Sequence, residues 1–432
     1  LDKFDTFDHK CKPKSMTVED SEQLSQYISK YCYKGKHPAV SPPKSDIKSI
    51  IDKIVQTVEP IQETDPASVQ NRKIFNNFLK HTSIDMEFII ACFQGDFELD
   101  FKTPDGIFAS VAKNGMYYLQ GIVGLNLVNS RKRNAYLRSS ELELIQKTLE
   151  KDIQCGCNRF ETWVALGQIY SYLVEYDLIW TADKLNSIER KHQTAFTQKK
   201  ALLCYFNAIN TLNKLPNSER SKASAVLPGF WESLGKELYA AWREPMNKRA
   251  FHVKPKEDKN DQIIYLASND IPHNAISKLL DLAFKNAYEL NRSSWFDLMY
   301  LAKSELMLQY VDVKSKLIVE SLLKACTLSL DQSNKEDPIL EPHYYLFTIV
   351  GKLLKRGIIT EADAIQIYKD DDLFVSIFEG EESTDFPIIA KKMLEKMIDY
   401  DKKKWQHKPV YKLAKWYHDV EHNNLKAKEE ML

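Results

Sequence analysis

The hydrophobic positions along the chain recur mostly at helical spacing. Between residues 45 and 58, apolar side chains repeat at the i, i+3, i+4 and i+7 positions of one helix face, and Pro60 is expected to end that helix. In the C-terminal third, Thr360 is predicted to cap a helix, and Pro387 and Pro409 to open two more. Helices of roughly 12–18 residues joined by short polar turns are typical of helical repeats. The pattern therefore predicts an all-α fold.

One stretch, WVALGQIY, carries a more specific signature. Its spacing on one helix face is that of the first helix of a tetratricopeptide repeat. The four signature positions are Trp163, Leu166, Gly167 and Tyr170. A glycine inside a helix costs about 1 kcal/mol relative to alanine, so we expect another helix to pack closely against Gly167. The matching second-helix positions are Ala201, Tyr205 and Ala208.

More chain than usual separates these two halves of the repeat. Trp163 precedes Ala201 by 38 residues, whereas the first and second helices of a standard repeat are offset by roughly 16. We therefore place an insert of about 22 residues, near Glu175–Gln198, at the turn between the helices. Its apolar residues and alternating charges favour helix that extends the Trp163 helix or folds back on it, rather than a solvated loop.

Trp180, in this insert, has two interpretations. In the first interpretation, it packs on its own repeat or the next one, as most large aromatic side chains do. Alternatively, it lies exposed beside Asp177 and Asp183 and anchors a partner subunit. Asp177, Trp180 and Asp183 are therefore the candidate partner-binding residues.

Patterned and unpatterned stretches divide the chain into segments. Residues 1–140 are predicted to form an N-terminal helical segment with loops, and 141–252 the tetratricopeptide-like repeat with its insert at 175–198 and the following helix. The charged stretch 253–270 is predicted to be a linker, and 271–432 a helical-repeat segment. The predicted fold is an α-solenoid of tetratricopeptide-like repeats, with helix above roughly 60%.

Charge and cysteine content limit the function classes. Lys+Arg and Asp+Glu are both 60, so the chain has no global basic field, and we expect contact with nucleic acid only indirectly unless it is local. The seven cysteines lack paired spacing, which favours a reducing compartment.

No apolar run reaches the roughly 18 residues of a membrane span. Because the chain begins with Leu1 and no signal peptide follows, we expect a piece of a longer protein.

Motifs of catalysis and cofactor binding are absent from the sequence. It contains no H-E-x-x-H, G-x-S-x-G, kinase or C-x-x-C motif, and no phosphate-loop glycine pattern. Three glycines in one apolar stretch instead indicate close helix packing or a broken helix; they are Gly115, Gly121 and Gly124. One loose His and Cys set matches no standard zinc-finger spacing; it comprises His9, Cys11, Cys32 and His37. We expect no enzyme, cofactor or metal.

A peptide-binding adaptor or cochaperone is the alternative among binding proteins. Tetratricopeptide domains that capture C-terminal carboxylates carry cations on the groove side of the first helix. The corresponding residues here are Val164 and Gln168, and neither is cationic. Carboxylate capture is therefore disfavoured.

Three blocks of sequence resemble a known family, the large tetratricopeptide subunit of the fungal histone regulation (HIR) complex, whose animal relative is the calcineurin-binding protein cabin. The blocks are ETWVALGQIYSYLVEYDLIWTADKLNSIERKHQTAFTQKKALLCYFNAI, LYAAWREPMNKRAF and DKKKWQHKPVYKLAKWYHD. They span about Glu161–Asp419, and residues 1–140 are less recognisable. The most diagnostic part is DLIWTADKL followed by KKALLCY.

The resemblance implies a nuclear, non-enzymatic scaffold. Such a subunit would hold the WD-repeat subunits and a small ubinuclein-like subunit of a chaperone that deposits histones outside replication. It would act in nucleosome assembly and transcriptional regulation, with histones bound directly or through the other subunits. The family supplies no catalytic residue to carry over to this chain.

Overall fold

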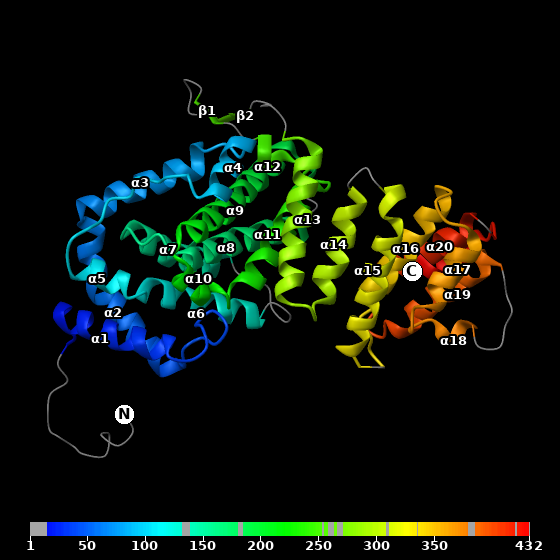
Figure 1. Cartoon of the computed structure of the whole chain (residues 1–432), viewed down its shortest axis with the longest axis horizontal. Helices are drawn as coiled ribbons and strands as arrows, with labels where there is room; N and C mark the ends of the chain where they lie inside the picture. Colours follow the sequence, from blue (N-terminus) through cyan, green and yellow to red (C-terminus); the bar gives the residue numbers. More distant parts are fainter. Residues whose placement is uncertain are drawn as a thin grey trace, which may run out of the picture. The chain divides into compact units, whose positions relative to one another are not determined.

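A computed structural model describes most of the chain. The described residues are 15–131, 139–179, 185–252, 255–257, 263–265, 271–307, 311–334, 336–378, 385–419 and 421–431. The chain forms two compact units, which divide between Ile271 and Pro272. Both units are built from α-helices (Figure 1), and the predicted all-α fold is confirmed. The finer division into four segments stays a prediction.

Unit 1 contains twelve helices and one two-stranded sheet in its described part. In chain order they are α1 (Val18–Tyr33), α2 (Ser45–Thr64), α3 (Pro66–His81), α4 (Met86–Gln94), α5 (Ile107–Lys113), α6 (Met116–Arg131), α7 (Ser139–Gln154), α8 (Phe160–Ile179), α9 (Ile188–Lys214), α10 (Asn217–Ala223), α11 (Leu227–Trp242), α12 (Arg249–His252), β1 (Pro255–Glu257) and β2 (Ile263–Tyr265). The two strands lie within the predicted linker and pair antiparallel, with Lys256 opposite Ile264.

The central helix of unit 1 is α9. It packs against α3, α4, α8, α11 and α12 (Figure 1). Every residue from Ala201 to Thr211 is buried. A helix segment that is buried on all sides must be surrounded by other elements, so these five helices form a bundle around α9. Helices α1, α2, α5 and α6 pack around a second core.

Two glycines of α6 allow α7 to approach closely. A Cβ on Gly121 would overlap the side chain of Leu149, and a Cβ on Gly124 would lie 2.8 Å from Cγ1 of Ile145. Close helix packing, predicted for these glycines, is confirmed. Gly115 instead separates α5 from α6 and has a φ of +83°, a backbone conformation that glycine adopts at little cost.

The predicted helix end at Pro60 is wrong. Helix α2 continues through Pro60 to Thr64. Proline removes one helical hydrogen bond, but the additional turn buries Gln62 completely. It also leads directly into α3, because the Asp65 carboxylate accepts a hydrogen bond from the Ser68 N–H at 2.7 Å. Packing and capping therefore outweigh the local preference of proline.

Unit 2 contains nine helices in its described part. They are α13 (His273–Leu290), α14 (Trp295–Met307), α15 (Val311–Asp331), α16 (Glu341–Lys355), α17 (Glu361–Lys369), α18 (Val375–Phe378), α19 (Phe386–Tyr400), α20 (His407–Asp419) and α21 (Asn424–Met431). Consecutive helices are the main contacts of one another, as in helical repeats. Thr360 caps α17 as predicted, because its hydroxyl accepts from the Asp363 N–H at 3.2 Å.

Among the described helices, none has the length and apolar character to cross a membrane.

Candidate functional site

The tetratricopeptide signature lies where α8 packs against α9. Trp163 is fully buried, and its indole N–H donates to Oδ1 of Asn158 at 2.6 Å. A Cβ on Gly167 would lie 2.5 Å from the ring of Tyr205, so the predicted close contact is confirmed. Gly167 therefore packs α8 against α9, whereas Trp163 lies against Phe75 and Phe78 of α3.

The insert lengthens both helices of this pair. Helix α8 continues to Ile179, and α9 begins at Ile188. Ser187 caps α9, since its hydroxyl accepts from the Arg190 N–H at 3.2 Å. Leu185, two residues before this cap, is buried. In the described part of the insert, residues up to Ile179 extend the first helix and residues from Ile188 belong to the second; residues 180–184 lie outside the described part of the chain.

Asp177 joins the two helices near their connected ends. Its carboxylate accepts hydrogen bonds from Arg190 at 2.5 Å and from the Thr194 hydroxyl at 2.8 Å. Its side chain is 14% exposed, so these contacts occupy much of the carboxylate. The other two candidates, Trp180 and Asp183, lie outside the described residues.

Two apolar side chains at these helix ends face solvent. Ile179 is 59% exposed and Ile188 is 68% exposed. Single exposed apolar residues are common, but neighbouring ones mark contact sites more often. We call the described residues 177–179 and 185–188 at these helix ends the hairpin tip. Sequence reasoning noted that both isoleucines are apolar, but their exposure depends on where α8 ends and α9 begins.

The groove-side positions of α8 line a small cavity. Val164 and Gln168 border a volume of about 220 Å³ together with Tyr118 and Ile122 of α6. The Gln168 amide donates to the Ser233 hydroxyl at 3.3 Å. Glu161 is the charged group among the described lining residues. A cavity with this lining cannot neutralise a bound carboxylate.

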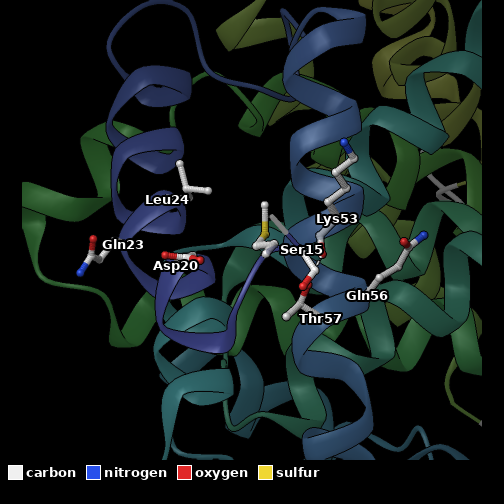
Figure 2. Close-up of a pocket in the computed structure, with 8 residues that line it drawn as sticks. Ser15, Asp20, Gln23, Leu24, Lys53, Gln56 and Thr57 are labelled. Carbon is white, nitrogen blue, oxygen red and sulfur yellow. Dashed lines mark hydrogen bonds between the residues drawn. The ribbon is translucent and has the colours of Figure 1, made fainter. Parts of the chain in front are cut away.

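A larger hollow of about 800 Å³ lies between α1 and α2. Figure 2 shows Asp20 and Leu24 on α1, and Lys53 and Thr57 on α2. The Asp20 carboxylate accepts from the Thr17 N–H at 3.0 Å, so it also caps α1. The lining of this hollow combines single charges with short polar groups.

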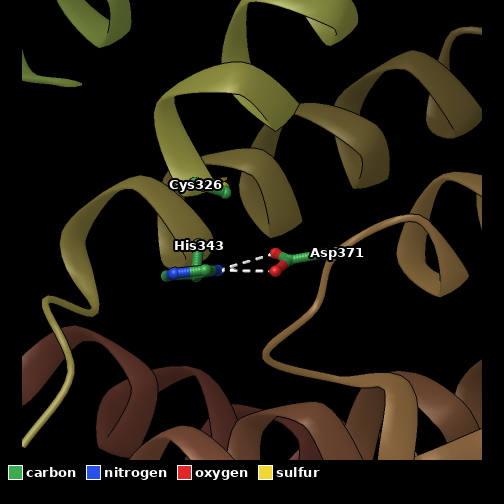
Figure 3. Close-up of side chains that lie close together, drawn as sticks. All are labelled: Cys326, His343 and Asp371. Atoms are coloured by element: carbon green, nitrogen blue, oxygen red, sulfur yellow. Dashed lines mark hydrogen bonds and ion pairs between the residues drawn. The ribbon is translucent and has the colours of Figure 1, made fainter. Parts of the chain in front are cut away.

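A buried polar cluster of Cys326, His343 and Asp371 lies within unit 2 (Figure 3). Nδ1 of His343 lies 2.8 Å from both carboxylate oxygens of Asp371. Nε2 of the same ring lies 3.3 Å from the hydroxyl of Ser329. Sequence reasoning missed this cluster, because its members are distant in the chain and follow no motif.

The cluster is best explained as a structural link. The atoms of these three side chains that could bind a metal ion lie within 4.8 Å of one another. However, both ring nitrogens of His343 already have protein partners. Burial raises the pKa of the Cys326 thiol well above its ordinary value, and the nearby Asp371 charge adds to this shift. A protonated thiol is a poor metal ligand and a poor nucleophile. The cluster therefore ties α15, α16 and the segment after α17 together.

Comparisons with known proteins match both units. The sequence matches the HIR3 helical bundle domain over residues 34–291 and the HIR3 TPR domain over residues 317–432. The Trp163 signature thus lies in the bundle domain, and the tetratricopeptide domain follows it. The TPR match supports the predicted helical repeats.

Curated fungal proteins named histone transcription regulator 3 homolog are similar over nearly all of the chain. Identity is 31% for the Debaryomyces hansenii protein over 100% of this chain, and 34% for the Candida albicans protein over 94%. The Candida glabrata protein is 31% identical over 94%. The chain covers 24%, 26% and 27% of these relatives, or about a quarter of their length. By its bundle domain, its tetratricopeptide domain and these relatives, the chain belongs to the HIR3 family of histone transcription regulators.

Proposed function

We propose that this chain is part of the non-enzymatic scaffold subunit of a replication-independent histone chaperone complex of the HIR type. It would act in the nucleus, in nucleosome assembly and transcriptional regulation. The observation that carries this proposal is similarity of up to 34% identity, over nearly the whole chain, to histone transcription regulator 3 homologues. Two successive helical domains offer the extended contact surfaces that a scaffold needs.

The partners we propose are the WD-repeat subunits and the ubinuclein-like subunit of the complex, with histones bound directly or through them. We assign one partner contact to the hairpin tip. Ile179 and Ile188 supply exposed apolar surface, and Trp180 and Asp183 lie in the chain between them. The role of Asp177 in this proposal is to hold α8 and α9 together through Arg190.

A peptide-binding adaptor or cochaperone remains the alternative function. The cavity beside α8 argues against its carboxylate-binding form, because Val164 and Gln168 border it and Glu161 adds a negative charge. An adaptor would need cationic groups there to bind a C-terminal carboxylate.

Affinity purification of the full-length protein followed by mass spectrometry tests the proposed function. Recovery of WD-repeat chaperone subunits and a ubinuclein-like subunit supports it. Recovery of heat-shock chaperones without those subunits favours the adaptor. Recovery of neither group contradicts both functions.

A further inference from the structure

Positive charge is concentrated near the end of unit 2. Between Lys402 and His418 the sequence contains six lysines and no aspartate or glutamate, although the whole chain has equal numbers of acidic and basic residues. The same stretch holds two tryptophans and two tyrosines. A local field of one sign attracts a polyanionic partner even when the net charge of the protein is zero.

The structure places these lysines on the surface with two aromatic side chains among them. Trp405 is 73% exposed and Tyr411 is 57% exposed. The six lysines are also exposed; they are Lys402, Lys403, Lys404, Lys408, Lys412 and Lys415. On α20, residues 408, 411, 412 and 415 share one face, because they recur at helical spacing. We call this set of eight residues the Lys–aromatic surface.

The loop that presents Trp405 is held in place. The Asp401 carboxylate accepts from the Trp405 N–H at 3.0 Å and from the Gln406 N–H at 2.5 Å. Lys403 forms an ion pair with Asp337 at 2.5 Å, and its Nζ lies 5.1 Å from the centre of the Trp405 ring. A preorganised aromatic side chain loses less entropy on binding than a mobile one. Trp405 is thus an exposed and positioned ring.

Four lysines of this surface keep their charge available, because Lys403 pairs with Asp337 and the charge of Lys415 helps to lower the pKa of the Asp419 carboxyl group. Within the described part of the chain, ion pairing on this surface is confined to Lys403. The remaining lysines extend from the loop before α20 along its exposed face. A lysine whose charge is not already compensated by a carboxylate can neutralise a phosphate and release a counterion.

We propose that the Lys–aromatic surface binds single-stranded nucleic acid. The lysines would contact backbone phosphates, and Trp405 and Tyr411 would stack on unpaired bases, which duplexes do not offer along their length. The exposed rings favour this ligand over a duplex, whose binding needs cations alone. An acidic peptide is less favoured because it has no regular array of planar groups for the rings. The zero net charge of the whole chain excluded only a global basic field, so this local surface would add a direct contact to the indirect ones expected.

Fluorescence anisotropy with the full 432-residue chain tests the proposal. The labelled probes are an oligo(dT) of about 12 nucleotides and a duplex of the same length. We expect the oligo(dT) to bind more tightly than the duplex, with an affinity that falls as salt rises. Unlabelled polyglutamate should compete poorly.

Variants separate stacking from charge. Trp405→Ala should weaken oligo(dT) binding by about tenfold, and Trp405→Phe should restore most of it. Replacing Lys408, Lys412 and Lys415 with alanine should reduce the slope of log affinity against log salt by about 2. The matched control replaces three exposed lysines of unit 1, which are Lys34, Lys36 and Lys44, and should change neither property.

Thermal melts of all variants establish that they fold. The proposal is overturned if oligo(dT) does not bind, if the duplex binds equally well, or if polyglutamate competes at equal charge concentration. It is also overturned if Trp405→Ala binds as tightly as the wild type. Failure of oligo(dT) to bind would leave the surface without a nucleic-acid ligand. Equal binding of the duplex would assign the surface to duplex DNA, and competition by polyglutamate would assign it to an acidic protein segment.

Discussion

Gly167 and Tyr205 are in direct contact across the α8–α9 pair: a Cβ on the glycine would lie 2.5 Å from Cε1 of the tyrosine ring. Because Tyr205 is fully buried, the ring has little room to move aside. Gly167→Leu should therefore lower the unfolding free energy by about 1–3 kcal/mol, partly offset by the better helix propensity of leucine. Thermal denaturation of the purified chain measures this change.

Gly351, inside α16, is the matched control for that substitution. No heavy atom lies within 4 Å of the position that its Cβ would occupy. Gly351→Ala should raise stability by up to about 1 kcal/mol, because alanine is the better helix former. If Gly167→Leu melts at or above the wild-type temperature, the close contact with Tyr205 is wrong.

Asn71 joins three chain segments from a fully buried position. Its amide nitrogen donates to the carbonyls of Lys102 at 2.8 Å and Gln154 at 2.9 Å, and its Oδ1 accepts from the Lys102 N–H at 2.7 Å. Asn71→Ala should cost about 3 kcal/mol, because it leaves backbone groups without partners. Urea denaturation checks the value. A loss below about 0.5 kcal/mol would mean that water replaces the amide.

Glu237 predicts a pH dependence of stability. Burial raises the pKa of its carboxyl group to about 7, although nearby Ser171 and Gln198 oppose the shift. Between its ordinary pKa and about 7, the folded state keeps a proton that the unfolded state has lost. Stability should therefore fall as pH rises through this window, by at most about 3 kcal/mol.

Glu237→Gln tests this dependence directly, because glutamine has a similar shape and does not titrate. The variant should be more stable than the wild type at pH 8, and the difference should shrink towards pH 5. Denaturant unfolding at several pH values measures the difference. Parallel pH profiles for the two proteins would show that Glu237 does not titrate in this range.

The His343–Asp371 pair should show strong coupling. Removing either side chain alone leaves a buried polar partner unpaired and should cost roughly 3–5 kcal/mol. Replacing both residues with leucine should cost less than the two single changes added together. Additive losses in a double-mutant cycle would contradict a direct interaction between His343 and Asp371.

The sequence predicted those features that local periodicity determines. The helix pattern and the Thr360 cap depend on residues within one or two turns, so spacing alone identified them. The contact at Gly167 crosses to another helix and was predicted from the tetratricopeptide signature. Pro60 was predicted to end α2 because its local preference is strong. The prediction failed because Gln62 packs into the core from the next turn, and tertiary packing is not visible in a local pattern.

The candidate site could be predicted only in part. The apolar residues and alternating charges of the insert indicated helix that extends the Trp163 helix or folds back on it. The pairing of Asp177 with Arg190 and the exposure of Ile188 follow from how α8 and α9 face each other, which the sequence does not specify. The Cys326–His343–Asp371 cluster forms only when three distant segments pack together.

We propose that the hairpin tip attaches the scaffold subunit to its chaperone complex. The most direct test is the amount of WD-repeat and ubinuclein-like subunits recovered with full-length protein carrying Ile179→Ser and Ile188→Ser. Leu144→Ser is the control, since Leu144 is also 68% exposed and lies on α7. We predict unchanged melting temperatures for both proteins, and a loss of at least one partner subunit only with the tip variant. Full recovery of every subunit with the folded tip variant would contradict the claim.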